Sequence, residues 1–188
     1  MRMRNLISDI LDYSKLAKAE EQFLEVDLNE VVDHLILDYD LLIEQKRAKV
    51  TIENLPVVKA NPIQMSQLFR NLIGNALKFT KKDRDPVISI SASKAEPADI
   101  LKIHAGNSNA EFWKIQIKDN GIGFETEYFE RIFNIFQRLH SKSDFEGTGI
   151  GLAMCKKIVQ NHGGDIFAES VFGEGAVFTI IIPINLHV

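Results

Sequence analysis

The stretch that decides the fold is residues 67–79, Gln-Leu-Phe-Arg-Asn-Leu-Ile-Gly-Asn-Ala-Leu-Lys-Phe. It is rich in apolar side chains, yet Asn71, Asn75 and Lys78 stand at positions that share one face of a helix. Asparagine is a poor helix former and is costly to bury without hydrogen-bond partners. Amide oxygens suit a hard cation and an ammonium suits anionic oxygens, so this polar stripe is suited to a metal–phosphate ligand. The solvent face of an ordinary amphipathic helix would show the same pattern.

Around this stretch, apolar spacing and turn residues predict an interleaved series of elements. Helices are expected over residues 1–22, 29–46, 61–79, 125–136 and 152–162. Strands are expected near residues 23–28, 50–52, 57–58, 87–93, 112–118, 166–171 and 176–184, the last two as a closing hairpin. Asn29 and Asn61-Pro62 are the expected openings of the second and third helices. Because helices alternate with strands and hairpins also occur, the sequence predicts an α+β fold, a two-layer α/β sandwich with a mixed sheet.

Two glycine clusters adjoin these elements. Asp119-Asn120-Gly121-Ile122-Gly123 ends a predicted strand, where glycines let a ligand approach the backbone and a carboxylate can accept from an amino-bearing ring; an ordinary turn would look the same. Gly147-Thr148-Gly149-Ile150-Gly151 directly precedes a predicted helix, and backbone N–H groups at such a place favour phosphate. A dinucleotide-binding fingerprint is excluded because Leu152 or Met154 stands where its third glycine belongs, and the chain has no P-loop motif.

Composition and charge exclude several classes of protein. The 188 residues are 45% hydrophobic and 26% charged, an ordinary globular mix. A net charge of −4 and a pI near 5.8 argue against nucleic-acid binding. The lone Cys155 excludes an internal disulfide framework and a multi-cysteine zinc site. No apolar run approaches the roughly 18 residues of a membrane span and no signal core opens the chain, so we expect a cytoplasmic location without membrane contact.

The motifs are more specific in their order than singly. That order is Asn71-x-x-x-Asn75-x-x-Lys78, Asp119-x-Gly121-x-Gly123, Phe133-x-x-Phe136, Gly147-Thr148-Gly149-x-Gly151-Leu152 and Gly173-x-Gly175. It resembles the ATP-binding catalytic domain of sensor histidine kinases, in the GHKL superfamily with gyrase, heat-shock chaperones and mismatch-repair ATPases. The resemblance covers about residues 23–188, with residues 136–140 similar to phytochrome-type kinases. It implies a Bergerat-type ATP-binding fold, with helices covering one face of the sheet.

The first helix adds a second resemblance. Residues 6–14 look like the second helix of the dimerisation and phosphoacceptor hairpin of these kinases. The implied division is therefore a partial hairpin at residues 1–22 and a catalytic ATP-binding domain at residues 23–188. In the parent protein, this resemblance implies a homodimer formed through the hairpin and a response-regulator receiver domain as partner.

The resemblance also implies a role for each residue that faces phosphate. ATP and Mg²⁺ are the expected cofactors. Asn75 should hold Mg²⁺, Asn71 should support the phosphates and Lys78 should contact phosphate oxygens. The rest of the nucleotide-binding loop should comprise Gly147, Thr148, Gly149, Gly151 and Leu152.

Adenine and the γ-phosphate have their own implied residues. Asp119 should accept a hydrogen bond from the adenine amino group, in a pocket shaped by Gly121 and Gly123. Residues 138–147 should form a mobile lid, and from it Arg138 should reach the γ-phosphate. The catalytic residues implied by the resemblance are therefore Asn71, Lys78 and Arg138.

Departures from the pattern bear on the reaction. Hydrolytic members of the superfamily carry a glutamate at the position of Asn71, and an amide cannot serve as a general base. We therefore expect transfer of the γ-phosphoryl group to a histidine rather than hydrolysis. None of the five histidines precedes an acidic residue, so the acceptor is expected on a partner hairpin. The alternatives are an ATP-hydrolysing clamp of the gyrase type and a degenerate, non-catalytic interaction module.

Overall fold

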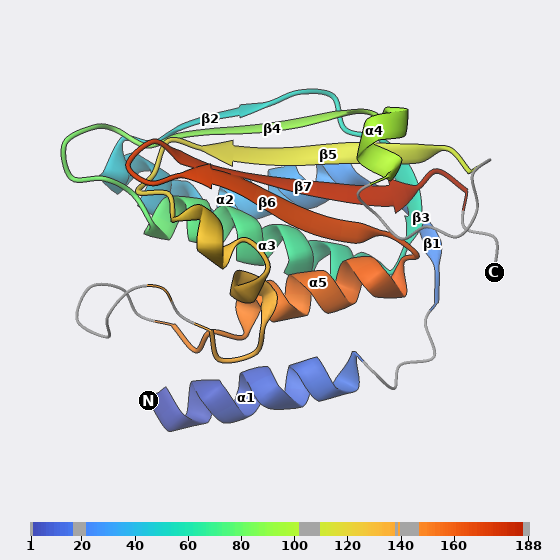
Figure 1. Cartoon of the computed structure of the whole chain (residues 1–188), viewed down its shortest axis with the longest axis horizontal. Coiled ribbons are helices and arrows are strands. Elements are labelled where there is room, and N and C mark those ends of the chain that lie inside the picture. Colours follow the sequence, from blue (N-terminus) through green and yellow to red (C-terminus); the bar gives the residue numbers. More distant parts are fainter. Residues whose placement is uncertain (1, 17–21, 102–109, 138, 140–146, 186–188) are drawn as a thin grey trace.

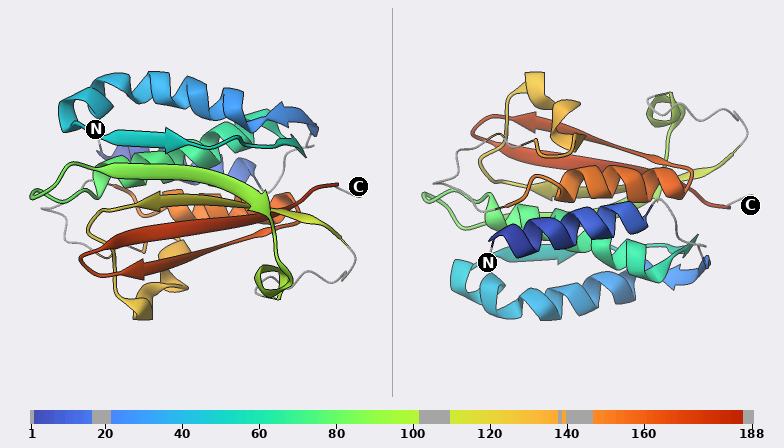
Figure 2. Two further views of the ribbon diagram at one scale, coloured as in Figure 1. Left: turned by 90° about the horizontal axis from the view of Figure 1, so that it is seen from above. Right: turned by 90° about the horizontal axis from the view of Figure 1, so that it is seen from below.

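The computed structural model describes residues 2–16, 22–101, 110–137, 139 and 147–185 (Figure 1). A β-sheet forms one layer and three helices pack on one of its faces as the second layer (Figures 1 and 2). Those helices are α2 (Leu28–Lys46), α3 (Pro62–Lys78) and α5 (Gly151–Asn161). The predicted α+β sandwich is therefore confirmed.

The main sheet has five strands in the order β2-β4-β5-β7-β6. Their bounds are Lys49–Ile52 for β2, Val87–Lys94 for β4, Phe112–Asp119 for β5, Gly175–Pro183 for β7 and Asp165–Val171 for β6. The β2–β4 pair is parallel and the other pairs are antiparallel, so the sheet is mixed as predicted. The strands β1 (Leu24–Asp27) and β3 (Val57–Ala60) instead pair with each other in a separate two-stranded sheet.

Helix α3 supplies the centre of the core. Its fully buried face packs with the inward side chains of β4 and β5, and the buried residues are Met65, Leu68, Phe69, Leu72, Ile73, Leu77, Ile88, Ile90, Ile115 and Ile117. Burying each such side chain contributes about 1.5–3 kcal/mol. Because the apolar face of α3 is fixed by this packing, the polar residues on its other face are held at a fixed place beside the end of β5.

The start of α2 differs from the prediction. Asp27 rather than Asn29 caps the helix, since the Asp27 carboxylate accepts from the backbone N–H of Asn29 at 2.8 Å. The Asn29 side chain instead bridges to Leu55, donating to its carbonyl at 2.7 Å and accepting from its N–H at 2.8 Å. The Asn29 side chain, which the sequence pattern predicted to cap α2, is therefore engaged by a tertiary contact with a residue 26 positions away.

The predicted helix over residues 125–136 is wrong. The segment contains two short 3₁₀ turns, η1 (Thr126–Tyr128) and η2 (Arg131–Phe133). It is anchored at both ends, because the N–H of Phe124 donates to Ser170 Oγ at 2.8 Å and the N–H of Phe136 donates to the Gly149 carbonyl at 2.9 Å. Phe136 has a left-handed φ of 66°, which a continuous α-helix does not accommodate.

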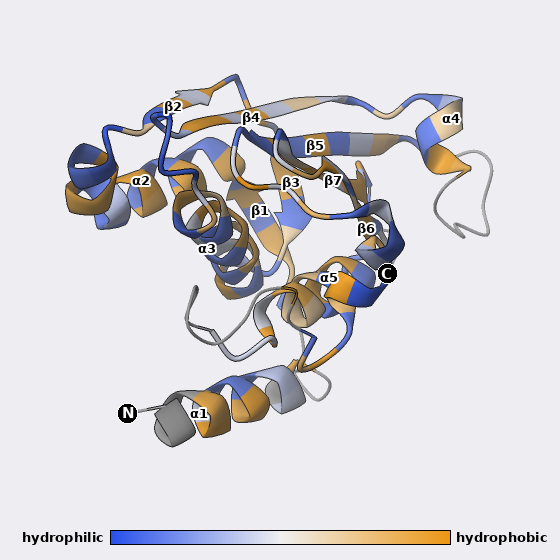
Figure 3. Cartoon of the chain, turned by 60° about the vertical axis from the view of Figure 1, so that its left-hand side comes forward, coloured by the Kyte–Doolittle hydropathy of each residue, from blue (hydrophilic) through white to orange (hydrophobic). Residues whose placement is uncertain are grey.

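The N-terminal helix α1 (Arg2–Lys15) lies beyond α3 and α5, on the side away from the sheet (Figures 1 and 2). It carries hydrophobic and hydrophilic residues side by side (Figure 3). Leu16 is buried and its carbonyl accepts from Asn161 Nδ2 at 2.9 Å, whereas Ile7 and Leu11 are more than half exposed. The end of the predicted helix, residues 17–21, lies outside the described residues.

Two further features complete the fold. A short helix, α4 (Pro97–Ile100), stands where the sequence suggested only loop, and its start is closed by reciprocal contacts between Glu96 and Asp99. Cys155 is fully buried in α5. None of the described helices is long and apolar enough to cross a membrane.

Candidate nucleotide site

A cavity of about 290 Å³ opens between α3, the end of β5 and the loop before α5. Most of the residues that the sequence singled out line it, namely Asn71, Asn75, Lys78, Asp119, Gly123, Gly147, Thr148, Gly149, Gly151 and Leu152. Gly121 lies directly beside it, next to Asp119. Arg138 and residues 140–146 of the predicted lid lie outside the described residues.

Two parts of the cavity are built from different elements. The strand-end part comprises Asp119, Gly121, Gly123 and Ala176, at the ends of β5 and the start of β7. The helix–loop part comprises Asn71, Asn75, Lys78, Gly147 and Thr148, from α3 and the glycine loop.

In the strand-end part, Asp119 is held by the backbone. The N–H groups of Gly121 and Ala176 both donate to its Oδ1, at 2.8 and 3.3 Å. Burial raises the pKa of the Asp119 carboxyl above its ordinary value of 3.8, and the two backbone hydrogen bonds oppose that rise. Since both N–H groups use Oδ1, Oδ2 is the oxygen that suits a donor on a ligand. Ala176 therefore contributes through its backbone N–H, which its side-chain type does not reveal.

Gly121 is required by close approach. A Cβ at this position would lie 2.3 Å from the Phe79 carbonyl oxygen and 2.8 Å from Asp119 Oδ1. Real side chains do not tolerate such contacts, so any larger residue would push the turn away from the end of α3. The glycine therefore keeps Asp119 in place against the cavity.

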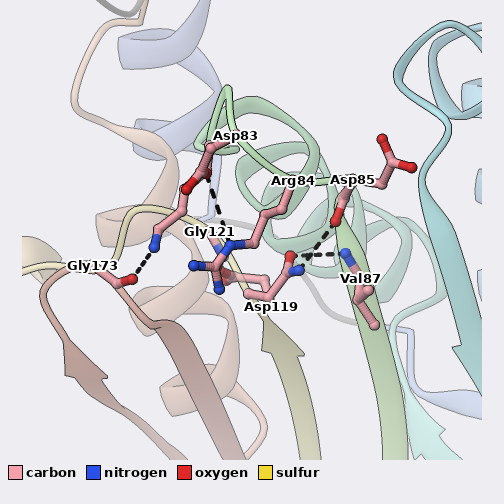
Figure 4. A network of polar contacts seen from close by, with 9 residues as sticks. Asp83, Arg84, Asp85, Val87, Asp119, Gly121 and Gly173 are labelled. Atoms are coloured by element: carbon pink, nitrogen blue, oxygen red, sulfur yellow. Dashed lines mark hydrogen bonds and ion pairs between the residues drawn. The ribbon is translucent and has the colours of Figure 1, made fainter.

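A network of polar contacts fixes the turn that carries Asp119 and Gly121 (Figure 4). The Asn120 side chain accepts from the N–H of Val87 at 2.8 Å and donates to the Asp85 carbonyl at 3.1 Å. Lys81 Nζ donates to the Gly173 carbonyl, which ties the segment after α3 to the β6–β7 turn. These contacts hold the strand-end turn against β4 and the β6–β7 turn.

Side chains dominate the helix–loop part. Asn71 Nδ2 donates to the Gly151 carbonyl at 3.3 Å, which links α3 to the first residue of α5. Lys78 Nζ lies 4.5 Å from the centre of the Phe79 ring and beside Gly147, where a Cβ would stand 2.9 Å from the ammonium. The polar stripe thus faces the cavity and the glycine loop, rather than open solvent.

Asp9 is a charged lining residue that the sequence analysis missed. The Thr148 hydroxyl donates to Asp9 Oδ2 at 2.6 Å, although the two residues are 139 positions apart. Asp9 belongs to α1 and lines the same cavity. Asp9 lies within residues 6–14, whose resemblance to a hairpin helix gives no sign of a place in the cavity, so only the packing of α1 reveals it.

The donor set fits Mg²⁺ accompanied by phosphate. Among the described residues, no group of three or more His, Cys, Asp or Glu side chains is placed to hold a metal. Mg²⁺ keeps several waters and is commonly bound by few protein oxygens together with substrate phosphates. The amide oxygens of Asn71 and Asn75 beside the Lys78 ammonium suit such a metal–phosphate pair and no fully protein-bound ion.

Known proteins share sequence and fold with this chain. The model of the family described as "Histidine kinase-, DNA gyrase B-, and HSP90-like ATPase" matches residues 60–186. The phytochrome-like protein Cph1 of Synechocystis is 41% identical over 183 residues, 97% of this chain and 22% of Cph1. The sensor histidine kinase WalK of Bacillus subtilis is 32% identical over 189 residues, 97% of this chain and 28% of WalK. The chain thus spans less than a third of the length of either relative.

Solved structures agree on the fold. The structure of the histidine kinase ThkA in complex with the response regulator TrrA matches 98% of this chain and 48% of its own, with a TM-score of 0.69 and 23% identity. At that identity the likeness establishes the arrangement of elements alone. Together with the family match over more than half of the residues, it leads to one conclusion: the chain belongs to the family of histidine kinase-, DNA gyrase B- and HSP90-like ATPases.

Proposed function

We propose that the chain binds Mg·ATP and donates the γ-phosphoryl group to a histidine on a partner helical hairpin. The observation that carries this proposal is the cavity itself. It joins a buried carboxylate at a strand end to two amides, an ammonium and a glycine loop. The first feature suits an adenine amino group and the others suit a magnesium-bound triphosphate.

Each residue has a role in this proposal. Oδ2 of Asp119 accepts from the adenine amino group while the backbone holds Oδ1. Asn75 binds Mg²⁺, Asn71 supports the phosphates, and Lys78 and the Thr148 hydroxyl contact phosphate oxygens. Mg²⁺, when bound, neutralises charge on the β- and γ-phosphates. The protein then acts mainly by positioning and by electrostatics, as is general in phosphoryl transfer.

Asn71 favours transfer over hydrolysis. Its amide cannot accept a proton from water, so no general base stands at that position. Its Nδ2 already donates to the Gly151 carbonyl, which supports a structural link between α3 and the loop. Arg138, in the predicted lid, is proposed as a further contact to the γ-phosphate.

The parent protein is proposed to be a phosphorelay kinase of two-component signalling in the cytoplasm. We assign residues 1–22 to the second helix of a dimerisation and phosphoacceptor hairpin, and residues 23–188 to the catalytic domain. The parent would dimerise through the complete hairpin. A response-regulator receiver domain would take up the phosphoryl group, as the complex of ThkA with TrrA suggests.

The experiment supplies the acceptor histidine, which the proposal places on a partner hairpin. Incubated with γ-labelled ATP and Mg²⁺, the chain alone should neither label itself nor hydrolyse ATP briskly. Addition of a complete hairpin with its histidine, in trans or by fusion, should produce an acid-labile, base-stable label on the hairpin. Brisk phosphate release without an acceptor would instead indicate a hydrolytic clamp. Absence of nucleotide binding would indicate a non-catalytic module.

A further inference from the structure

The contact between α1 and the glycine loop points to a regulatory residue of the nucleotide site. We propose that Asp9 competes with a nucleotide phosphate for the Thr148 hydroxyl, so that docking of α1 and binding of nucleotide oppose each other. This inference rests on the proposed function, because it takes Thr148 to be a phosphate contact.

The first argument is the donor count. A threonine hydroxyl carries a single hydrogen and can donate one hydrogen bond at a time. In this structure that hydrogen bond goes to Asp9 Oδ2, at 2.6 Å. A phosphate oxygen that needs the same donor must displace the carboxylate.

The second argument is charge. Among the described residues that line the cavity, the carboxylates are Asp9 and Asp119, and the cation is Lys78. Asp119 belongs to the strand-end part, whereas Asp9 stands at Thr148, beside the loop that also contacts Lys78. An anion there occupies the place of a phosphate and repels one that approaches. Nucleotides with more phosphates should therefore be affected more.

The third argument is that α1 is attached to the rest of the protein by few contacts and can detach from it. Among the α1 side chains that the structure describes, Tyr13 near the C-terminal end packs on the core, and Leu16, directly after the helix, is buried and has its carbonyl bound by Asn161. Ile7 and Leu11 face outward, with exposed fractions of 53% and 54%. The Asp9–Thr148 hydrogen bond is thus a discrete contact that joins the helix to the cavity. By thermodynamic linkage, whatever draws α1 away raises nucleotide affinity, and nucleotide loosens α1 to the same degree.

The test compares two single-atom changes on one helix. Asp9→Asn removes the charge at Thr148, and Asp12→Asn removes the same charge one turn later, in a residue that lines a different cavity. Dissociation constants for Mg·AMPPNP, Mg·ADP and adenosine are measured by calorimetry for the whole chain. Asp9→Asn should tighten AMPPNP binding about tenfold, tighten ADP binding less and leave adenosine unchanged, whereas Asp12→Asn should match the wild type.

A second measurement reports how firmly α1 is attached to the rest of the protein. Amide exchange in α1 of the wild type should become faster on addition of Mg·AMPPNP and should not respond to adenosine. Equal AMPPNP affinity for wild type and Asp9→Asn, an equal gain for Asp12→Asn, or an equal gain for adenosine would each overturn the inference while the proposed function stands. If no variant binds adenosine or AMPPNP, the proposed function fails and this inference fails with it.

Discussion

In the strand-end part of the cavity, the Asp119 carboxylate is held by the N–H groups of its own turn and of the neighbouring strand, whereas in the helix–loop part polar side chains of α1 and α3 reach across to the glycine loop and the start of α5. The two donors keep their places while the sheet is closed, because Ala176 belongs to β7 and the turn at Gly121 lies against the Phe79 carbonyl. Contacts such as Thr148–Asp9 and Asn71–Gly151 can be exchanged for others while the core stays closed. The molecule thus presents a preformed place for a base and an adjustable place for phosphates.

The largest effect is expected in the adjustable part. Asn75→Ala removes the proposed Mg²⁺ ligand and should lower phosphoryl transfer to an added hairpin by on the order of 10²-fold or more. The measurement is the initial rate of acid-labile labelling at saturating ATP. Ser66→Ala, on the same helix but outside this cavity, is the control and should retain the wild-type rate. Undiminished transfer by Asn75→Ala would remove Asn75 from the site.

Substitutions in the two parts of the cavity should differ in how much they lower the free energy of unfolding of the protein. Gly121→Ala places a Cβ 2.3 Å from the Phe79 carbonyl oxygen and should lower the free energy of unfolding by about 1–3 kcal/mol. Thr148→Ala, in the helix–loop part, removes the hydrogen bond to Asp9 but leaves the core packed, so it should lower this free energy by about 0.5–1 kcal/mol. Urea unfolding of both variants, followed by circular dichroism, makes the comparison. Equal effects would mean that the two parts are equally rigid.

The pH dependence of folding should report the burial of Asp119. Its pKa is raised in the folded protein, so its contribution to stability is fully present below the ordinary pKa of 3.8 and is lost as pH rises through the raised value. Asp119→Asn lacks this titration. On lowering the pH from 7 towards 4, the wild type should therefore gain stability relative to Asp119→Asn, by about 1.4 kcal/mol for each unit by which the pKa is raised. Parallel pH profiles of the two proteins would contradict the assignment.

The C-terminal end of α5 offers a test outside the cavity. His162 is buried, accepts from the N–H of Asn61 through Nε2 at 3.1 Å and has its Nδ1 2.8 Å from the Ile158 carbonyl oxygen. It therefore joins the start of α3 to the end of α5. His162→Phe would leave the Asn61 N–H without this acceptor and should cost about 1–3 kcal/mol, with nucleotide affinity retained. Wild-type stability would show that the link is dispensable.

Much of this arrangement could be predicted from the sequence, because the motifs lie on regular elements. The face shared by Asn71, Asn75 and Lys78 follows from helical spacing, and Asp119 follows from its place at the end of an alternating strand. Local pattern failed where tertiary contacts decide. Asn29 bonds to Leu55 in place of capping α2, and the segment after Gly123 is anchored to Ser170 and Gly149 in place of forming a helix.

The Asp9 contact could not be predicted at all. It joins residues 139 positions apart, and an acidic residue on the polar face of an amphipathic helix carries no signal of its partner. A backbone donor such as the Ala176 N–H cannot be recognised from the sequence either, because every residue except proline has one.

The central claim, that Asp119 binds adenine in an ATP site, is tested most directly by calorimetric titration with Mg·ATP and Mg·GTP. The wild type should bind ATP and discriminate against GTP. Asp119→Asn keeps an oxygen for Gly121 and Ala176 but turns a donor towards the base, so it should lose about 1–3 kcal/mol of ATP affinity and most of the discrimination. Equal affinity of the wild type for ATP and GTP, or unchanged selectivity in Asp119→Asn, would contradict the account.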